Sequence, residues 1–345
     1  MTDESQAVRR PLWQRILTQA MLVFFSAVFI MPFIWLMSSS VKTDAQIFKT
    51  PPEWVPLLPV TVDADGTQLP VYRDPSGARF ALVERDKETS QATVRPVLAD
   101  GSVGEVATRE FYGLQPERRF GLNWANYPEG LRFIKFGRQL TNTLIICISS
   151  AIGCVLSCSL VSYGLARIDW GGRKWLFYAI LATMMIPPQV TMVPLFVVWA
   201  KLHMVNTYWP LILPSFLAPG FFVFLLRQFF LGIPQDLTDA AKLEGCGELG
   251  IYWRIVLPLS KPALATVALF AFLGAWNDYL GPLIYLSDER MYTLSLGIAS
   301  FSSQYGSFPG MLMAVSTVMT VPIILLFFFT QRTFIQGITL TGMKG

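Results

Sequence analysis

The stretch from Gly232 to Lys261 reads GIPQDLTDAAKLEGCGELGIYWRIVLPLSK and lies between two long apolar segments. Within it, Asp236 stands three residues before Asp239, which is an acidic variant of the capping box at a helix start. Gly245 and Gly247 then end this helix, because glycine takes the left-handed conformation without strain. A second short helix follows the glycines. The stretch therefore predicts two short helices that form a compact knob.

The rest of the chain has the composition of a membrane protein. Of its 345 residues, 53% are hydrophobic and 14% are charged, and the mean hydropathy is +0.46. An ordinary soluble domain carries about 25% charged residues. A soluble globule of this size would not cover its surface with so few charges, so the sequence predicts an integral membrane protein.

Crossing a bilayer takes about 20 consecutive apolar residues, and six segments qualify. Prolines at positions 187, 188, 214 and 219 would interrupt the third and fourth of them. We therefore expect an all-α integral membrane protein with six transmembrane helices. The predicted spans are 16–40, 140–166, 176–199, 208–230, 262–286 and 310–331.

Lysine and arginine in short loops predict the orientation, because they favour the cytoplasmic side. With the N-terminus inside, the short outer loops hold only Lys201 and Arg290. Both termini and the knob then face the cytoplasm. The predicted parts are an N-terminal tail with the first span (1–43), an outer insertion (44–138), a five-helix core (139–332) and a cytoplasmic tail (333–345).

The outer insertion holds 25 of the chain's 50 charged residues. Three short runs of apolar, branched and charged residues, Leu69–Arg73, Ala78–Glu84 and Thr93–Leu98, are separated by turn-forming residues. They predict a small antiparallel sheet. Two interpretations stay open: the insertion contacts an external partner, or it is an inert addition to a tolerant loop.

The knob carries a specific motif. It reads Asp239-Ala240-Ala241, three residues, Gly245, nine residues, then Ile255-x-Leu257-Pro258. This pattern resembles the EAA loop of type I ABC importer permeases, with every spacing matched and Asp239 in place of Glu. The resemblance covers about residues 1–60 and 120–345, and it does not extend to the segment at about 61–119.

Three further stretches are similar to carbohydrate-type permeases, the group that includes the maltose and glycerol-phosphate systems. Asn142 lies in a Leu-Thr-Asn-Thr-Leu stretch like the one that opens their second span. The residues Trp276, Asn277, Asp278 and Tyr279 resemble part of their fifth span. The end of the chain, from Gly337 to Gly345, is similar to the ending of their smaller permease.

The resemblance implies one half of a translocation pore in a bacterial or archaeal cytoplasmic membrane. A second permease would complete the pore, and two copies of an ATP-binding subunit would hold ATP and magnesium. A solute-binding protein would deliver the carbohydrate, and lipid would surround the spans. The residues implied to couple to the ATPase are Asp239, Ala240, Ala241, Gly245, Ile255, Leu257 and Pro258, and those implied to lie along its interface are Thr341, Gly342, Lys344 and Gly345.

The intramembrane polar residues Asn277 and Asp278 allow two interpretations. With Trp276 and Tyr279 they could line the sugar path, because buried acids usually face protein or water. Alternatively, they make structural contacts between helices. We predict no cofactor bound by this chain, no metal site and no nucleic-acid partner, since the chain has one histidine and no basic run interleaved with aromatics.

The sequence also lacks a phosphate-binding loop of the Gly-x4-Gly-Lys-Ser/Thr type. We therefore predict that the chain is not an enzyme and that ATP is hydrolysed by partner subunits. A secondary transporter or channel that works without ATP is the alternative. It would leave the knob unexplained, and it would need coupling acids in several spans, where Asp278 alone is available.

Overall fold

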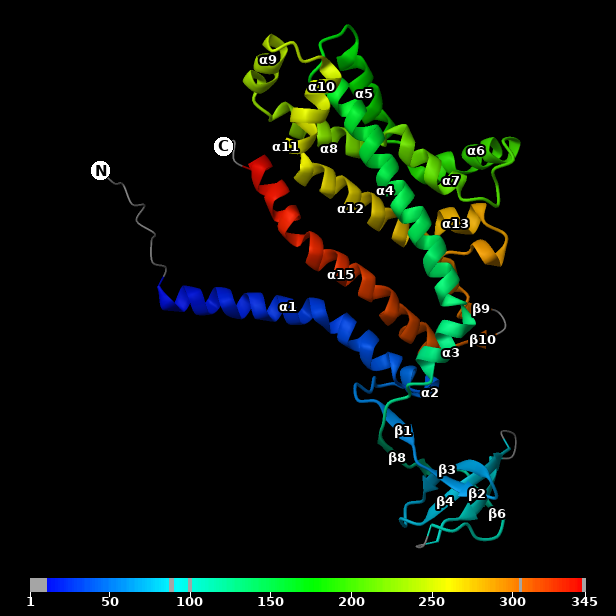
Figure 1. Cartoon of the computed structure of the whole chain (residues 1–345). Coiled ribbons are helices and arrows are strands. Elements are labelled where there is room, and N and C mark those ends of the chain that lie inside the picture. Colours follow the sequence, from blue (N-terminus) through cyan, green and yellow to red (C-terminus); the bar gives the residue numbers. More distant parts are fainter. Residues whose placement is uncertain (1–10, 87–89, 99–100, 304–305, 343–345) are drawn as a thin grey trace. The chain divides into compact units, whose positions relative to one another are not determined.

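The computed structural model describes residues 11–86, 90–98, 101–303 and 306–342. The chain divides into two compact units, one of residues 1–130 with 307–317 and the other of residues 131–306 with 318–345. The first unit contains the first long helix and a set of strands. The second contains a bundle of helices and the knob (Figure 1).

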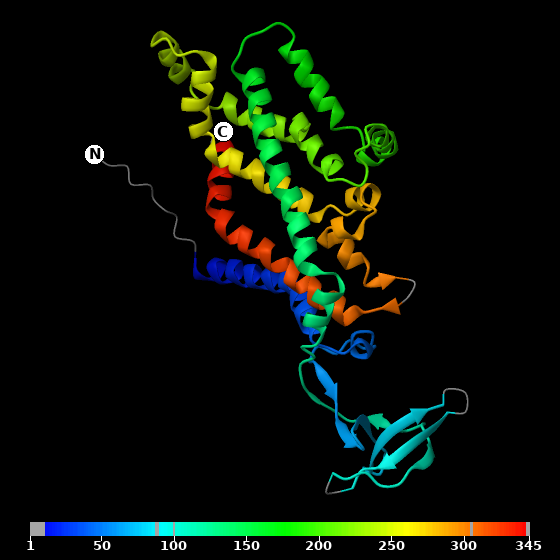
Figure 2. The ribbon, with the colours of Figure 1, turned by 45° about the vertical axis from the view of Figure 1, so that its right-hand side comes forward.

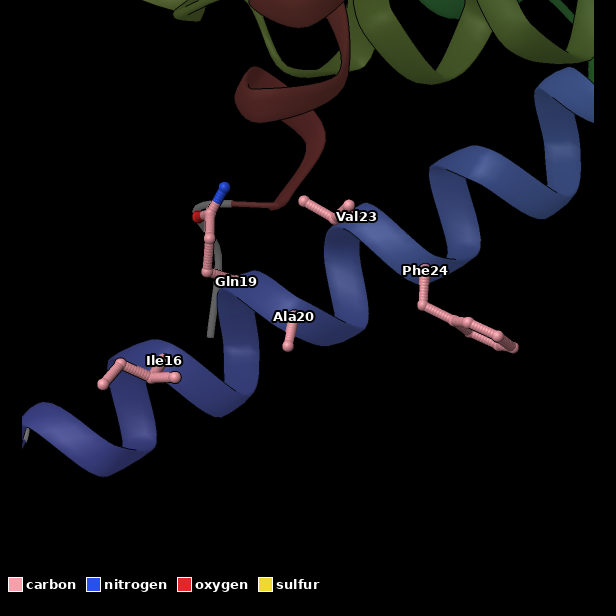
Figure 3. Close-up of a pocket in the computed structure, with 5 residues that line it drawn as sticks. All are labelled: Ile16, Gln19, Ala20, Val23 and Phe24. Atoms are coloured by element: carbon pink, nitrogen blue, oxygen red, sulfur yellow. The ribbon is translucent and has the colours of Figure 1, made fainter.

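The first unit begins with α1 (Leu12–Ser40), an almost entirely apolar helix. None of its most apolar 18-residue window is buried within this chain. Figure 3 shows one hollow on its surface, where Ile16, Gln19, Ala20, Val23 and Phe24 project from consecutive turns. Their spacing places these five on one helix face. The described residues of its own unit leave the apolar surface of α1 uncovered, which is typical of a helix that faces lipid or another protein.

A set of hydrogen bonds ties the end of α1 to the C-terminal part of the insertion. Asn126, at the start of α3 (Asn126–Phe133), donates through Nδ2 to the carbonyl oxygens of Ser40 and Lys42, both at 2.9 Å. The hydroxyls of Ser40 and Tyr127 lie 2.8 Å apart. The two ends of the insertion are thereby held together beside the membrane helix.

The insertion contains a β-sheet (Figure 2). An antiparallel sheet has the order β2-β3-β4-β5-β6, with β7 also paired to β3, and β1 pairs with β8. Val71, Phe80 and Val94 are buried at its centre. Strands β3, β4 and β5 overlap the three runs that the sequence indicates. The strands are β1 (Leu57–Pro59), β2 (Thr61–Ala64), β3 (Thr67–Arg73), β4 (Arg79–Arg85), β5 (Gln91–Pro96), β6 (Ala107–Glu110), β7 (Gln115–Pro116) and β8 (Arg118–Phe120), and a short helix α2 (Asp44–Ile47) precedes them.

The second unit is built around one long helix, α4 (Phe136–Ala166), which packs against α12, α8 and η1. Its core is apolar and includes Phe230, Ile251 and Val256. The elements are α5 (Arg173–Thr183), α6 (Pro188–Lys201), α7 (Trp209–Ile212), η1 (Leu213–Leu217), α8 (Gly220–Leu231), α9 (Gln235–Leu243), α10 (Glu248–Ile251), η2 (Tyr252–Val256), α11 (Leu257–Leu259), α12 (Lys261–Asn277), α13 (Leu280–Tyr285), η3 (Glu289–Met291), α14 (Leu294–Ala299), the two-residue strands β9 (Ser302–Ser303) and β10 (Gly306–Ser307), and α15 (Pro309–Gly342). Strand β10 and helix α15 each have residues in both units.

Among the residues that the structure describes, four helical segments are long and apolar enough to cross a membrane, and two further bent pairs raise the number to as many as six. One bent pair is α5 with α6, which meet at 98°. The break falls just before Pro187 and Pro188, because proline has no backbone N–H to continue the helix. A 3-10 turn likewise separates α7 from α8 around Pro214. The prolines therefore interrupt the third and fourth segments as predicted.

Two boundaries differ from the prediction. The fifth segment does not continue to residue 286, because α12 ends at Asn277 and α13 begins at Leu280. The Asp278 carboxylate accepts a hydrogen bond from the Gly281 N–H at 3.0 Å, so this side chain competes with the helix for backbone donors. The last helix, α15, extends to Gly342, beyond the predicted boundary at residue 332.

Candidate functional site

The first helix of the knob, α9, ends in a Schellman motif. The Cys246 N–H donates to the Ala241 carbonyl at 2.9 Å, and the Gly245 N–H donates to the Lys242 carbonyl at 3.0 Å. Gly245 has a φ of +81°, in the left-handed region. The motif satisfies the last carbonyls of the helix, and it requires a residue that accepts positive φ at position 245. The sequence correctly predicts that Gly245 ends this helix, but the same role for Gly247 is wrong, because Gly247 has a φ of −73° and is the N-cap residue of α10.

The predicted start of α9 is wrong. The helix begins at Gln235, its N-cap residue is Pro234, and no side chain caps it. Asp236 and Asp239 therefore lie inside the helix and form no capping box. Pro234 sets the start instead, since its fixed φ and missing N–H suit the residues that open a helix. Asp236 in the first turn still complements the positive end of the helix dipole.

Not every residue of the motif lies on the exposed surface of the knob. Asp239, Ala240 and Gly245 are exposed, but Ala241 is buried in the core of the second unit. The small side chain of Ala241 lets α9 pack on the core of the second unit, so Ala241 adds little to the exposed surface of the knob. Leu243 is 91% exposed at the C-terminal end of α9. The tip of the knob therefore presents an apolar side chain to its surroundings.

The second helix of the knob is irregular and turns directly into a membrane segment. After α10, the chain forms a π-helical turn over Tyr252–Val256, just before Pro258. The axis then bends by 78° at Ser260 to enter α12. Ile255 and Leu257 are half-buried against the core, and Pro258 is exposed. Ile255, Leu257 and Pro258 therefore shape the connection between knob and membrane segment.

A stripe of three polar side chains on α4 holds the knob. Ser159, Tyr163 and Arg167 are four residues apart, so they lie on one helix face. The Ser159 hydroxyl lies 2.7 Å from that of Tyr252. The Tyr163 hydroxyl donates to Glu248 Oε2 at 2.6 Å, and the Arg167 guanidinium donates to the Ile233 carbonyl. The stripe thus connects α4 to the second helix of the knob and to the chain that precedes the first.

Glu248 links the two helices of the knob as well as α4. Its Oε1 lies 2.8 Å from the Lys242 ammonium on α9, while its Oε2 accepts from Tyr163. Hydrogen bonds from Lys242 and Tyr163 favour the carboxylate and hold the pKa of Glu248 below its ordinary value. The same hydrogen bond with Glu248 raises the pKa of Lys242. Figure 1 shows α9 and α10 beyond the end of α4 that carries this stripe.

The four residues of the predicted sugar path differ in their exposure and in their contacts. Trp276 is 3% exposed and stacks on Phe272, with ring centroids 5.8 Å apart. Asn277 is exposed, and its Nδ2 donates to the Leu273 carbonyl of its own helix at 2.8 Å. Tyr279 is exposed. Asp278 alone of the four lines a cavity of about 330 Å³ within the second unit.

Asn142 holds a loop in place through side-chain hydrogen bonds. Its Nδ2 donates to the carbonyl oxygens of Arg290 and Tyr292 at 2.9 and 3.0 Å. The neighbouring Thr143 hydroxyl accepts from the Leu294 N–H at 3.0 Å. These bonds fasten the loop between α13 and α14 to the start of α4. Asn142 therefore positions a loop, and it does so through groups that the sequence does not reveal.

The predicted C-terminal interface falls at the edge of the described residues. Thr341 and Gly342 form the last residues of α15. Lys344 and Gly345 lie outside the described residues. Among the described residues, no group of three or more His, Cys, Asp or Glu side chains could hold a metal ion, and all four cysteines are free.

Comparison with known proteins places the chain in a family. Residues 158–340, which include α5 to α14 and the whole knob, match the model of the "binding-protein-dependent transport system inner membrane component" family. The chain belongs to this family. As a permease of this kind it is a multi-pass component of the inner membrane, and the knob lies inside the region that matches the family.

Similar permeases include several named after carbohydrates. The permease is 42% identical to the arabinooligosaccharides transport system permease protein of Halalkalibacterium halodurans, over 63% of this chain and 76% of the relative. It is 32% identical to the diacetylchitobiose uptake system permease protein of Streptomyces coelicolor, over 67% of this chain and 76% of the relative. A chain from the crystal structure of a bacterial ABC transporter for alginate shares the fold, with a TM-score of 0.64, 19% identity and coverage of 92% and 95%.

Reading the sequence missed three features of the site. The Ser159–Tyr163–Arg167 stripe carries a sequence signal, because polar residues recur every four positions near the end of an apolar helix. Leu243 carries another, since it is an apolar residue between the charged Lys242 and Glu244. The side chains that line the cavity beside Asp278 carry no signal of this kind, because they come from separate elements.

Proposed function

We propose that this permease forms half of the translocation pore of an ATP-driven carbohydrate importer, and that the knob of residues 232–261 receives the movement of an ATPase. The observation that carries the proposal is the attachment of the knob, by hydrogen bonds to α4 and by direct continuation of the chain into α12. An exposed tip bearing Leu243 lies at one end, and hydrogen bonds from Tyr163 and Ser159 lie at the other. A knob that is exposed at one end and bonded to a membrane helix at the other transmits motion from a bound protein into the membrane helices.

The other components follow from the family. A second permease would cover the exposed face of α1 and complete the pore. Two copies of an ATP-binding subunit would bind ATP and magnesium and would contact Asp239, Ala240, Leu243 and Gly245. An extracytoplasmic solute-binding protein would deliver the solute. The N- and C-termini would face the cytoplasm together with the knob, and the strand-rich insertion would lie outside.

The named relatives indicate the class of solute. Permeases for arabinooligosaccharides and diacetylchitobiose are among those similar to this chain. We propose an oligosaccharide as the substrate, and arabinotriose is the natural first probe.

The test is uptake by the complete complex, purified from its native membrane and reconstituted into liposomes with its binding protein. We expect uptake of labelled arabinotriose with ATP on the cytoplasmic side and none with a non-hydrolysable ATP analogue. Dissipating ion gradients with an ionophore should not change the rate. Uptake that proceeds without ATP and stops with the ionophore would instead establish a secondary transporter.

A further inference from the structure

The cavity of about 330 Å³ beside Asp278 has the construction of a ligand site. Its volume falls at the lower end of the range of about 300–1,000 Å³ that small-molecule sites occupy. Ala271, Gly274 and Ala275 of α12 and Asp278, the residue that follows its end, line the cavity at helical spacing. The three small residues leave the space open, and the carboxylate ends the row.

One polar group in this cavity has no hydrogen-bond partner in the described part of the chain. Ser150 on α4 is 3% exposed, and its hydroxyl has no hydrogen-bond partner among the described residues. A buried hydroxyl without a partner costs free energy, so such groups are uncommon in native proteins. Helical serines often bond to the carbonyl four residues back, but Ser150 does not, and it lines the cavity instead. The simplest account is that its partner is a ligand.

The remaining walls suit a sugar. Ser215 adds a second hydroxyl at the wall, and Phe222 and Phe270 add apolar ring surface. The position of Ser215 is fixed, because its carbonyl accepts from the Ser157 hydroxyl at 3.0 Å. A carbohydrate ring offers hydroxyl groups at its edge and C–H groups on its faces. Hydroxyl and carboxylate groups bond the former, and aromatic surface packs against the latter.

Charge narrows the class of ligand further. Asp278 is the one charged residue among those that line the cavity, and no lysine or arginine is among them. A carboxylate in a low-dielectric environment repels a ligand that carries phosphate or carboxylate groups. It accepts strong hydrogen bonds from neutral hydroxyls.

We infer that this cavity binds one ring of a neutral carbohydrate during its passage, with hydrogen bonds to Ser150, Ser215 and Asp278. The inference rests on the proposed function and adds two points to it. This subunit contacts the sugar itself, and the contact favours neutral sugars over acidic or phosphorylated ones. One phosphorylated solute is sn-glycerol 3-phosphate, which is named for the transport system of a relative from Yersinia enterocolitica. That relative is 33% identical over 59% of this chain and 73% of its own length.

The experiment measures equilibrium binding of labelled arabinotriose to the intact complex in nanodiscs, without the binding protein. Ser150→Ala removes one hydrogen bond, so its affinity should fall about threefold to tenfold. Its melting temperature should stay equal or rise, since the lost hydroxyl had no protein partner. Asp278→Asn should weaken binding about tenfold or more, because it removes a charge-assisted acceptor.

Ser162→Ala is the matched control. Ser162 lies on the same helix and is fully buried, but its hydroxyl donates to the Val223 carbonyl at 2.9 Å and does not line the cavity. This variant should melt at a lower temperature and bind arabinotriose with unchanged affinity. Unchanged affinity in both Ser150→Ala and Asp278→Asn would overturn the inference.

Charge selectivity is tested with trigalacturonate and glycerol 3-phosphate as anionic probes. The unaltered complex should bind both more weakly than arabinotriose, and Asp278→Asn should narrow the difference. Equal or tighter binding of either anion by the unaltered complex would overturn the inference. ATP-driven uptake of arabinotriose, measured in parallel, separates the two proposals. Normal uptake with these contrary binding results removes the inference alone, whereas no ATP-driven uptake by the unaltered complex removes the proposed function as well.

Discussion

The Gly245→Asp variant should insert into the membrane normally and lose ATP-driven uptake by about tenfold or more. Gly245 has a φ of +81° at the end of α9, where a residue with a Cβ carries about 1–2 kcal/mol of strain. Aspartate also places a negative charge at the negative end of the helix dipole. The Schellman motif would open, and the tip around Leu243 would no longer be held in one position. Uptake by reconstituted complexes, normalised to the amount of inserted protein, measures the effect.

Gly247 provides a matched control two residues away. It is the N-cap residue of α10, with φ −73° and ψ 164°, a conformation that aspartate adopts readily and a position that aspartate favours. A Cβ added at either glycine would meet no other atom within 4 Å, so the two substitutions differ in backbone conformation and not in space. Gly247→Asp should keep near-normal uptake. Normal uptake by well-inserted Gly245→Asp would contradict the role given to α9.

In the Tyr163→Phe variant, solute-loaded binding protein should no longer accelerate ATP hydrolysis, and uptake should fall about tenfold. The substitution deletes the hydroxyl that bonds Glu248 Oε2 at 2.6 Å, and a hydrogen bond to a charged group contributes about 1.5–3 kcal/mol. The ring keeps its contact with Tyr252, with centroids 5.2 Å apart. Packing is therefore kept, and the link between knob and α4 is broken.

A double-mutant cycle identifies the contact. Glu248→Gln combined with Tyr163→Phe should cost little more than either change alone, because both remove the same link. Lys242→Met removes an ion pair at the surface, where such pairs contribute about 0–1 kcal/mol, and should change uptake much less. Unchanged stimulation of ATP hydrolysis in Tyr163→Phe would show that the knob moves α4 by another route.

Local chemistry explains what could be predicted from the sequence. The left-handed turn at Gly245 and the interruptions at Pro187 and Pro188 depend on residues whose backbone preferences act within a few positions. Long apolar runs likewise mark the membrane segments, because the thickness of the bilayer fixes their length. The motif that begins at Asp239 locates the knob because its spacing is a property of the chain itself.

The remaining features depend on neighbours that lie far away in the sequence. Ala241 is buried because α9 packs on the core of the second unit, and the letters Asp-Ala-Ala do not indicate which alanine faces inward. Trp276 is buried and stacks on Phe272, and its place in the sequence does not reveal how far it is covered. The break at Asp278 requires the Gly281 N–H as a partner. Ser150 is informative only once its surroundings show that it has no partner in the described part of the protein.

Photo-crosslinking from position 243 tests the central claim most directly. A photoreactive phenylalanine analogue replaces Leu243, which is 91% exposed, in the native membrane, and Tyr112 of the insertion, 94% exposed, carries the same analogue as control. We predict that position 243 crosslinks a protein with a Gly-x4-Gly-Lys-Ser/Thr phosphate-binding loop and that position 112 does not. Crosslinks to lipid alone from position 243, in a complex that still imports its solute, would contradict the account.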